Sequence, residues 1–291
     1  MTAQKNGAEI GLFLALAILL SAVFWALIIQ AGHIAAGGGH YVEGLMWCPA
    51  VAALAVIAFK RLDIGTLGLS SFGGRYALLG YVTPLVYALI AYALVWGLGL
   101  GSFPNPAAIA TLSARLGWHV GNALFVPLYF ILMATTGMIG GTARALGEEI
   151  GWRGFMAPRM VAQWGFTRGA IVAGVIWAAW HMPLLLFADY NSGTPWWFAL
   201  SCFTVFVIAS SVMLTWIRLR SRSVWPCAIL HASHNLFIQT FFTPLTAPHG
   251  AVTAYAIDEF GVATPAVALV IAFLFWRARG QVESSDRKVL A

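Results

Sequence analysis

Two adjacent carboxylates, Glu148 and Glu149, border a long apolar stretch of this sequence and are followed by Arg153. If this stretch is helical, Glu149 and Arg153 lie one turn apart and can form an ion pair, whereas Glu148 points about 100° away. An unpaired glutamate among apolar neighbours can act as a general base near neutral pH. Solvated charges at an ordinary helix end are the alternative interpretation of this cluster alone.

Histidines occur at two further places in apolar sequence. His181 follows Trp177 by four residues and precedes Pro183, which kinks or ends a helix. His231 and Asn235 are also four residues apart, so both can project from one helical face into one cavity. A charged side chain in a membrane span costs about 2.5–3.5 kcal/mol on insertion scales, so polar residues there are candidate functional residues. A histidine hydrogen-bonded to a neighbouring helix is the structural alternative, above all for His181.

These residues together form a set suited to hydrolysis. Glu148 can serve as the base, the imidazoles of His181 and His231 can bind water or a metal ion, and the Asn235 amide can donate to a developing oxyanion. The set favours hydrolysis of a peptide bond by an activated water. His234 lies near the same helical face, and the sequence assigns it no role.

The elements that must position these residues are membrane-spanning helices. Hydrophobic residues make up 60% of the 291 residues and charged residues 9%, against roughly 45–50% and about 25% in soluble domains. The apolar excess extends over the whole length, which indicates several spans of about 20 residues. The sequence therefore predicts an all-α polytopic transmembrane helix bundle of about eight spans. The predicted spans are 10–31, 45–59, 77–98, 121–141, 167–188, 198–217, 224–242 and 256–276.

The basic residues predict the orientation of these spans. Of the 16 Lys and Arg residues, only Arg115 falls on the side of the predicted spans opposite the others. This bias predicts that both termini are cytoplasmic. It also explains the net charge of +6 without a nucleic-acid partner, because cationic loops are common in membrane proteins. We expect a protein of the bacterial inner membrane, with an active-site cavity that opens to the cytoplasmic side.

No internal repeat or folded domain outside the membrane is visible. We divide the chain into residues 1–120 with the first helices and loops, residues 121–245 as a core that carries the motifs, and residues 246–291 with the last helix and a basic tail.

The ordered motifs resemble those of the CAAX prenyl protease and bacteriocin-processing (CPBP, or Abi) family. The family pattern E-E-x-x-x-R, F-x-x-x-H and H-x-x-x-N reads here as Glu148-Glu149 to Arg153, then Trp177 to His181, then His231 to Asn235. Trp177 stands where the family usually has phenylalanine, which is one aromatic residue for another. The resemblance covers about residues 144–242, and the earlier helices match only in hydropathy and number.

The resemblance implies a role for each of these residues. Glu148 with His181 would activate water, and His231 with Asn235 would position water, a metal ion or the oxyanion. Glu149 would act with Arg153 to hold the helix geometry, and Trp177 would give structural support. Family members are described as metalloproteases, so zinc bound by Glu148, His181 and His231 is expected, although the chain has no H-E-x-x-H motif. The implied substrate is a membrane-associated protein or peptide, either a CAAX-type prenylated protein or a leader peptide.

Other designs fit the sequence less well. The four aspartates, Asp63, Asp189, Asp258 and Asp286, are predicted in loops or tails, which argues against a two-aspartate membrane protease. A rhomboid-type serine mechanism has no nucleophile in a span. Two non-protease alternatives stay open: a non-catalytic scaffold or bacteriocin-immunity protein of the same fold, and a transporter that uses the pocket as a proton relay, which would favour repeats that the sequence lacks.

Overall fold

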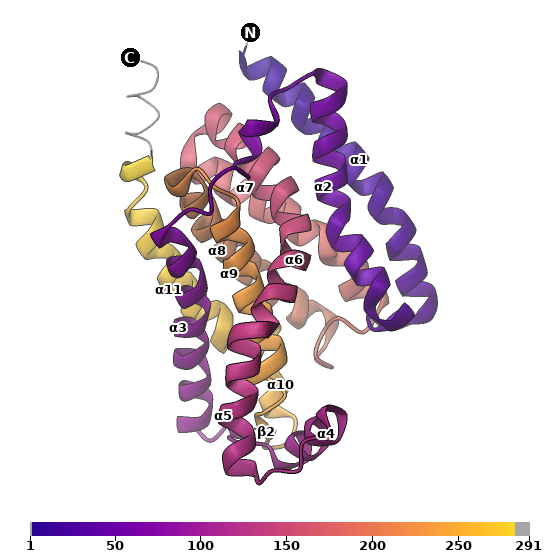
Figure 1. Ribbon diagram of the computed structural model, residues 1–291, viewed down its shortest axis with the longest axis vertical. Coiled ribbons are helices and arrows are strands. Elements are labelled where there is room, and N and C mark those ends of the chain that lie inside the picture. The colour runs from indigo at the N-terminus through magenta and orange to yellow at the C-terminus, as the bar shows by residue number, and fades with distance from the viewer. Residues whose placement is uncertain (1, 283–291) are drawn as a thin grey trace.

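The computed structural model describes residues 2–282, and nearly all of its regular structure is helical (Figure 1). Three π-helical segments join or extend the α-helices: η3 (Met133–Gly137), η4 (Ile150–Met156) and η5 (Asn235–Phe242). Two short 3₁₀ turns are η1 (Ala36–Gly39) and η2 (Ile64–Leu67), and the strands β1 (Gly101–Ser102) and β2 (Ala247–Pro248) form one antiparallel pair. The prediction of an all-α bundle is confirmed. The α-helices are α1 (Thr2–Ala31), α2 (His40–Lys60), α3 (Arg75–Gly97), α4 (Pro106–Leu116), α5 (Asn122–Leu132), α6 (Met138–Glu149), α7 (Ala157–Phe187), α8 (Trp196–Ser221), α9 (Trp225–His234), α10 (Val252–Ala256) and α11 (Ala263–Arg277).

Six helices within residues 2–282 are long and apolar enough to cross a membrane, and the chain is an integral membrane protein. One of the six, Asn122–Phe187, contains both the fourth and the fifth predicted span. Gly165 divides it, because its backbone has φ 77° and ψ 168°, a combination open essentially only to glycine. Beyond this break Gly169 packs against the backbone of Val161, so the chain turns back on itself without a loop. The number of eight spans stays a prediction.

Two glycines bring α2 against the helix that carries the paired glutamates. A Cβ atom added at Gly147 would lie 2.7 Å from the Met46 carbonyl oxygen, and one at Gly151 would lie 2.4 Å from Cβ of Pro49. Small residues four apart allow close approach of helices in membranes. Glu148 and Glu149 lie between these two glycines, so the close contact with α2 fixes the segment that presents both carboxylates.

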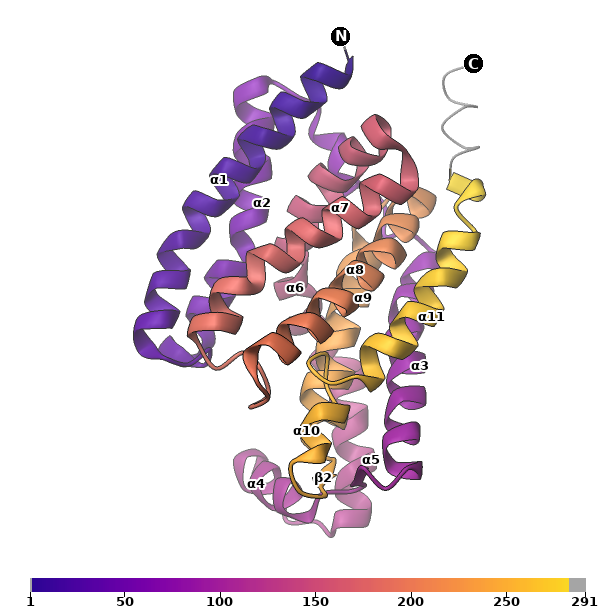
Figure 2. The same cartoon turned by 180° about the vertical axis from the view of Figure 1, so that it is seen from behind.

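Both described ends of the chain lie at the same end of the bundle. α1 starts and α11 finishes there, whereas the turn between α1 and α2 lies at the other end of α1 (Figures 1 and 2). Figure 2 also shows α7, α8 and α11 side by side on the back of the molecule. The described ends therefore lie on one side of the bundle, and cytoplasmic termini stay a prediction. Arg287 and Lys288 of the predicted basic tail lie outside the described residues.

Two arginines are not the loop cations that the sequence suggested. Arg144 forms an ion pair with Glu43 at 3.5 Å, and Glu43 lies in the first turn of α2, at the end of the bundle away from the termini. Arg153 is only 1% exposed and lies inside the bundle. The predicted loop between the fourth and fifth spans is instead continuous helix up to Gly165, which explains both errors.

Candidate active site

The carboxylate of Glu148 faces a cavity of about 130 Å³ that is bounded by the first turns of α2. The side chain is 2% exposed, and its Oε2 accepts a hydrogen bond of 2.8 Å from Nε1 of Trp177. His181, His231 and Asn235 line the same cavity. Four polar residues predicted from three separate spans therefore surround one space, with room for water.

Glu149 points away from this cavity, into the protein. Its Oε1 accepts hydrogen bonds from Nη1 of Arg153 at 3.1 Å and from Nδ1 of His231 at 3.0 Å. The guanidinium carbon of Arg153 lies 3.9 Å from the centre of the Trp177 ring. Both members of the ion pair are at most 1% exposed. Glu149 thus orients His231 as well as pairing with Arg153, which is more than the helix-holding role that the resemblance implied.

The two cavity histidines have the same tautomer when neutral. Nδ1 of His181 lies 2.9 Å from the Trp177 carbonyl oxygen, which can only accept, so Nδ1 carries the proton. Nδ1 of His231 likewise faces the Glu149 carboxylate. In both rings Nε2 then has a lone pair that can accept a hydrogen bond from water or bind a metal ion, the orientation that outer partners impose on ligating histidines.

The donor atoms suit zinc in kind, but they do not form a complete ligand group. Among residues 2–282 no set of three or more His, Cys, Asp or Glu side chains is placed to hold a metal ion.

The helix of His231 changes its winding at Asn235. α9 ends at His234, and the π-helical segment η5 starts at Asn235. The wider π-helical turn redirects side chains relative to an α-helix, and such turns are frequent at functional sites. Asn235 lines both the cavity of Glu148 and an adjoining cavity beside Tyr87 and His234.

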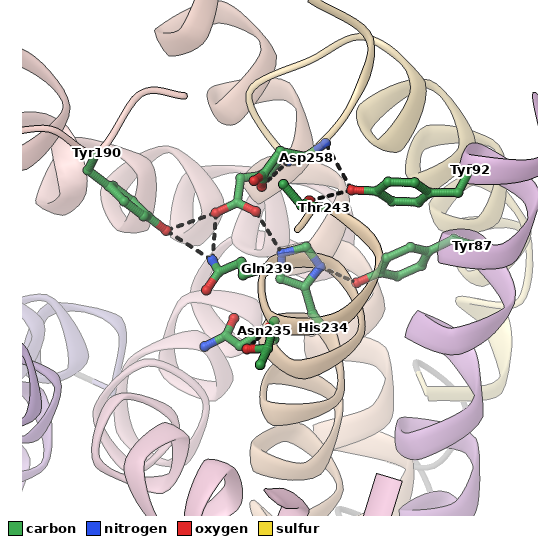
Figure 3. A network of polar contacts seen from close by, with 10 residues as sticks. Tyr87, Tyr92, Tyr190, His234, Asn235, Gln239, Thr243 and Asp258 are labelled. Atoms are coloured by element: carbon green, nitrogen blue, oxygen red, sulfur yellow. Dashed lines mark hydrogen bonds and ion pairs between the residues drawn. The ribbon is translucent and has the colours of Figure 1, made fainter. Parts of the chain in front are cut away.

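Several polar residues of these cavities were not predicted from the sequence. Glu259 is 1% exposed and accepts hydrogen bonds from Tyr190 and Gln239 (Figure 3). His234 contacts both Tyr87 and Glu259. Because the Glu259 carboxylate accepts, Nε2 of His234 donates and Nδ1 accepts from the Tyr87 hydroxyl. Both nitrogens of His234 are thus engaged, unlike those of His181 and His231.

One feature of the sequence could have indicated the polar residues around Glu259, namely a pair of ionisable residues near the start of the last predicted span. Asp258 was predicted in a loop, but the bounds of the last predicted span, 256–276, include both Asp258 and Glu259. The cost of burying a charged side chain in a span, which indicated Glu148 as a candidate, therefore applies to this pair as well. Both lie in the turn before α11. Burial and the neighbouring Glu259 carboxylate raise the pKa of Asp258 well above its ordinary value. The predicted third region, 246–291, therefore contributes directly to the site.

The cavities lead to the end of the bundle away from the termini. An outer cavity of about 230 Å³ shares Ile34, Tyr190 and Gln239 with the cavity of Glu148, and it reaches the exposed Ser192. Asp189 and Asp258 also line this outer cavity, but from loops. On the other side of the site, Leu67 of η2 is fully buried against Gly154 of η4. Cytoplasmic termini and a cytoplasmic opening were both predicted, and the position of the outer cavity favours an opening on the side opposite the termini.

The fold and the site define a class: a polytopic membrane protein whose helices enclose a carboxylate, two imidazoles and an amide around one internal cavity. Residues 130–237 match the family model "Type II CAAX prenyl endopeptidase Rce1-like". The chain is also similar to CAAX prenyl protease 2 of Methanococcus maripaludis, with 25% identity over 160 residues. That match covers 53% of this chain and 54% of the relative, so the chain spans about half the length of the relative. Both comparisons support the resemblance to the CPBP family. The seven motif residues lie in the matched region, and Glu259 lies outside it.

Proposed function

We propose that this chain is an intramembrane endopeptidase that hydrolyses a peptide bond of a membrane-associated substrate. The observation that carries the proposal is the single buried cavity lined by four polar residues from three different helices. The similarity of residues 130–237 to type II CAAX prenyl endopeptidases supports the same reaction class.

In the proposed mechanism Glu148 is the general base. Its carboxylate removes a proton from a water molecule, and the water oxygen attacks the carbonyl carbon of the substrate. Nε2 of His181 accepts a hydrogen bond from the remaining O–H of that water and so orients it. The electron pair of the carbonyl bond moves to the oxygen, which accepts a hydrogen bond from the Asn235 amide. Glu148 then passes its proton to the leaving amine as the C–N bond breaks.

The Trp177 indole and the Glu149 carboxylate orient these groups. Trp177 donates to one oxygen of Glu148 and leaves the other free to meet water. Glu149 holds His231 so that its Nε2 faces the cavity. A base and its partners held in one geometry before substrate arrives accelerate reaction, because no reorganisation is needed in the transition state.

For the substrate we propose a CAAX-type prenylated protein or a leader peptide, in a bacterial inner membrane. The test uses the full chain reconstituted in liposomes with two peptides: a farnesylated peptide that ends in Cys-aliphatic-aliphatic-X, and a leader peptide. Mass spectrometry of the products should reveal one defined internal cleavage in one of them. Intact peptides in both cases would favour the scaffold interpretation of the cavity.

We also propose that zinc binds to Glu148, His181 and His231, whose side chains would have to draw together around it, because they are not placed to hold an ion in this structure. When bound, zinc would polarise the carbonyl or the attacking water. Metal analysis of the purified chain should then give about one zinc per chain, as a single catalytic site with three protein ligands requires, and His231→Ala should lose it. Zinc-free protein that cleaves peptide at the full rate would contradict the bound metal and leave water activation to Glu148 and His181.

A further inference from the structure

A second buried carboxylate forms part of the cavity wall, and the proposed mechanism does not use it. Oε1 of Glu259 accepts hydrogen bonds from the Tyr190 hydroxyl at 2.9 Å and from Nε2 of Gln239 at 2.7 Å. Oε2 accepts from Nε2 of His234 at 3.3 Å (Figure 3). Among the described residues no Lys or Arg forms an ion pair with Glu259. Burying a carboxylate without a cation costs free energy, so the presence of Glu259 at this position needs an explanation.

The donors to Glu259 lie on both sides of Asn235 in the chain. His234 immediately precedes Asn235, and Gln239 follows it by one turn of the π-helical segment. In Figure 3 the side chains of Asn235 and Gln239 extend from the same side of this helix. The hydroxyl of Thr240 donates to the Asn235 carbonyl oxygen at 3.2 Å, which supports the wider turn. One carboxylate thus accepts hydrogen bonds from the residue before Asn235 and from a residue one turn after it.

Contacts with two other parts of the fold hold His234 and Glu259 in place. Tyr87 of α3 donates to Nδ1 of His234 at 2.8 Å, and the His234 ring stacks on Phe206 of α8 at 4.4 Å between ring centres. Tyr190 ties Glu259 to the turn after α7. The helix that carries Asn235 therefore has little freedom to rotate about its axis.

We propose that Glu259 is a positioning residue for the reaction: through His234 and Gln239 it fixes the rotation of η5 and so directs the Asn235 amide into the cavity. This inference rests on the proposed function. Glu259 itself touches neither the attacking water nor the carbonyl of the substrate.

The test is a double-mutant cycle of Glu259→Gln and Asn235→Ala, measured with the peptide that the wild-type chain cleaves, either the farnesylated or the leader peptide. Asn235→Ala alone should lower kcat by about 10²–10³-fold, as loss of one oxyanion donor does. Glu259→Gln alone should lower kcat by about 10–100-fold with little change in KM, because small misplacements have effects of this size. In the Asn235→Ala background the further loss should be less than about threefold, since residues that act as a unit are not additive.

Glu9→Gln is the matched control. Glu9 is also a buried carboxylate, 5% exposed, and it pairs with Arg159 at 2.9 Å away from the cavity. Its effect on kcat should be small and the same in both backgrounds. Equal losses from Glu259→Gln in both backgrounds would overturn the positioning role and leave only a structural one.

A structure of the variant, which does not depend on enzymatic activity, separates this inference from the proposed function. If the wild-type chain cleaves neither peptide, the proposed function fails, and the structure of the Glu259→Gln variant decides the inference. An Asn235 side chain turned out of the cavity supports it. An Asn235 side chain in its original place overturns it.

Discussion

Trp177 supplies a hydrogen bond that phenylalanine, the usual family residue, could not supply. Its indole nitrogen donates to Glu148 at 2.8 Å, and its ring lies against Arg153 and His231. The exchange of aromatic residues, which the sequence indicates as minor, therefore places a donor directly on the proposed base. A charge-assisted bond of this kind fixes one oxygen of the carboxylate and its rotamer.

Trp177→Phe should therefore lower kcat by about 10-fold, since a positioned hydrogen bond to a charged group is worth roughly 1.5–3 kcal/mol, and part of the ring packing remains. Trp180→Phe is the matched control. Trp180 lies in the same helix as Trp177, is equally buried at 5%, and donates to Ser21 of α1 at 2.8 Å. Steady-state kinetics of both variants measure the two losses in kcat. Equal losses would show that the packing of the indole, and not its hydrogen bond to Glu148, supports catalysis.

The residues that the sequence predicted share a trait that Glu259 lacks. Glu148, His181 and His231 each stand in motifs with helical spacing. Glu259 acts through Gln239 and His234, and these contacts depend on a turn between α10 and α11 that no periodicity predicts. The hydroxyl donors Tyr87 and Tyr190 likewise look like ordinary aromatic residues in the sequence.

At the scale of elements, close approach of α2 to the catalytic helix decides where the carboxylates lie. Hydropathy predicted this helix as the short segment 45–59, which contains Pro49, yet the helix runs unbroken from His40 to Lys60. Proline is tolerated in a membrane helix where neighbouring groups satisfy the backbone. Here Pro49 also fills the space that Gly151 leaves open. The sequence contains both residues, but their contact is between helices and no local pattern encodes it.

Gly151→Ala should therefore displace α2 and lower both stability and activity. The added Cβ would meet Pro49 backbone atoms at 2.7 Å, and relief needs a helix shift, typically at a cost of about 1–3 kcal/mol. Gly140→Ala is the control, because a Cβ there meets nothing within 4 Å. Thermal unfolding in detergent should separate the two variants, and equal midpoints would contradict tight packing at Gly151.

At the scale of the whole molecule, the cavity opening and the chain termini lie at opposite ends of the bundle. The cations still favour cytoplasmic termini after Arg144 and Arg153 are removed from the comparison. The opening at Ser192 would then face the extracytoplasmic side. A substrate presented after export, such as a leader peptide on a translocated precursor, would fit this orientation better than a cytosolic prenylated protein.

Cysteine accessibility tests this orientation in a chain whose native Cys48, Cys202 and Cys227 are replaced. Ser192→Cys, at the outer cavity, should react with a membrane-impermeant maleimide in intact cells. Ser70→Cys is exposed in the loop between α2 and α3, at the end of the termini, and should react only after lysis. The reverse pattern would place the termini outside and the cavity opening in the cytoplasm.

The central claim is that Glu148 activates water for peptide hydrolysis, and turnover of Glu148→Gln in liposomes tests it most directly. The variant keeps the shape of the side chain and can still accept from Trp177, but it cannot take a proton. We expect kcat to fall by about 10²–10⁴-fold with unchanged expression and thermal stability, whereas Glu149→Gln should lose stability through its broken pairing with Arg153. A Glu148→Gln protein that cleaves the peptide at the wild-type rate would contradict the account.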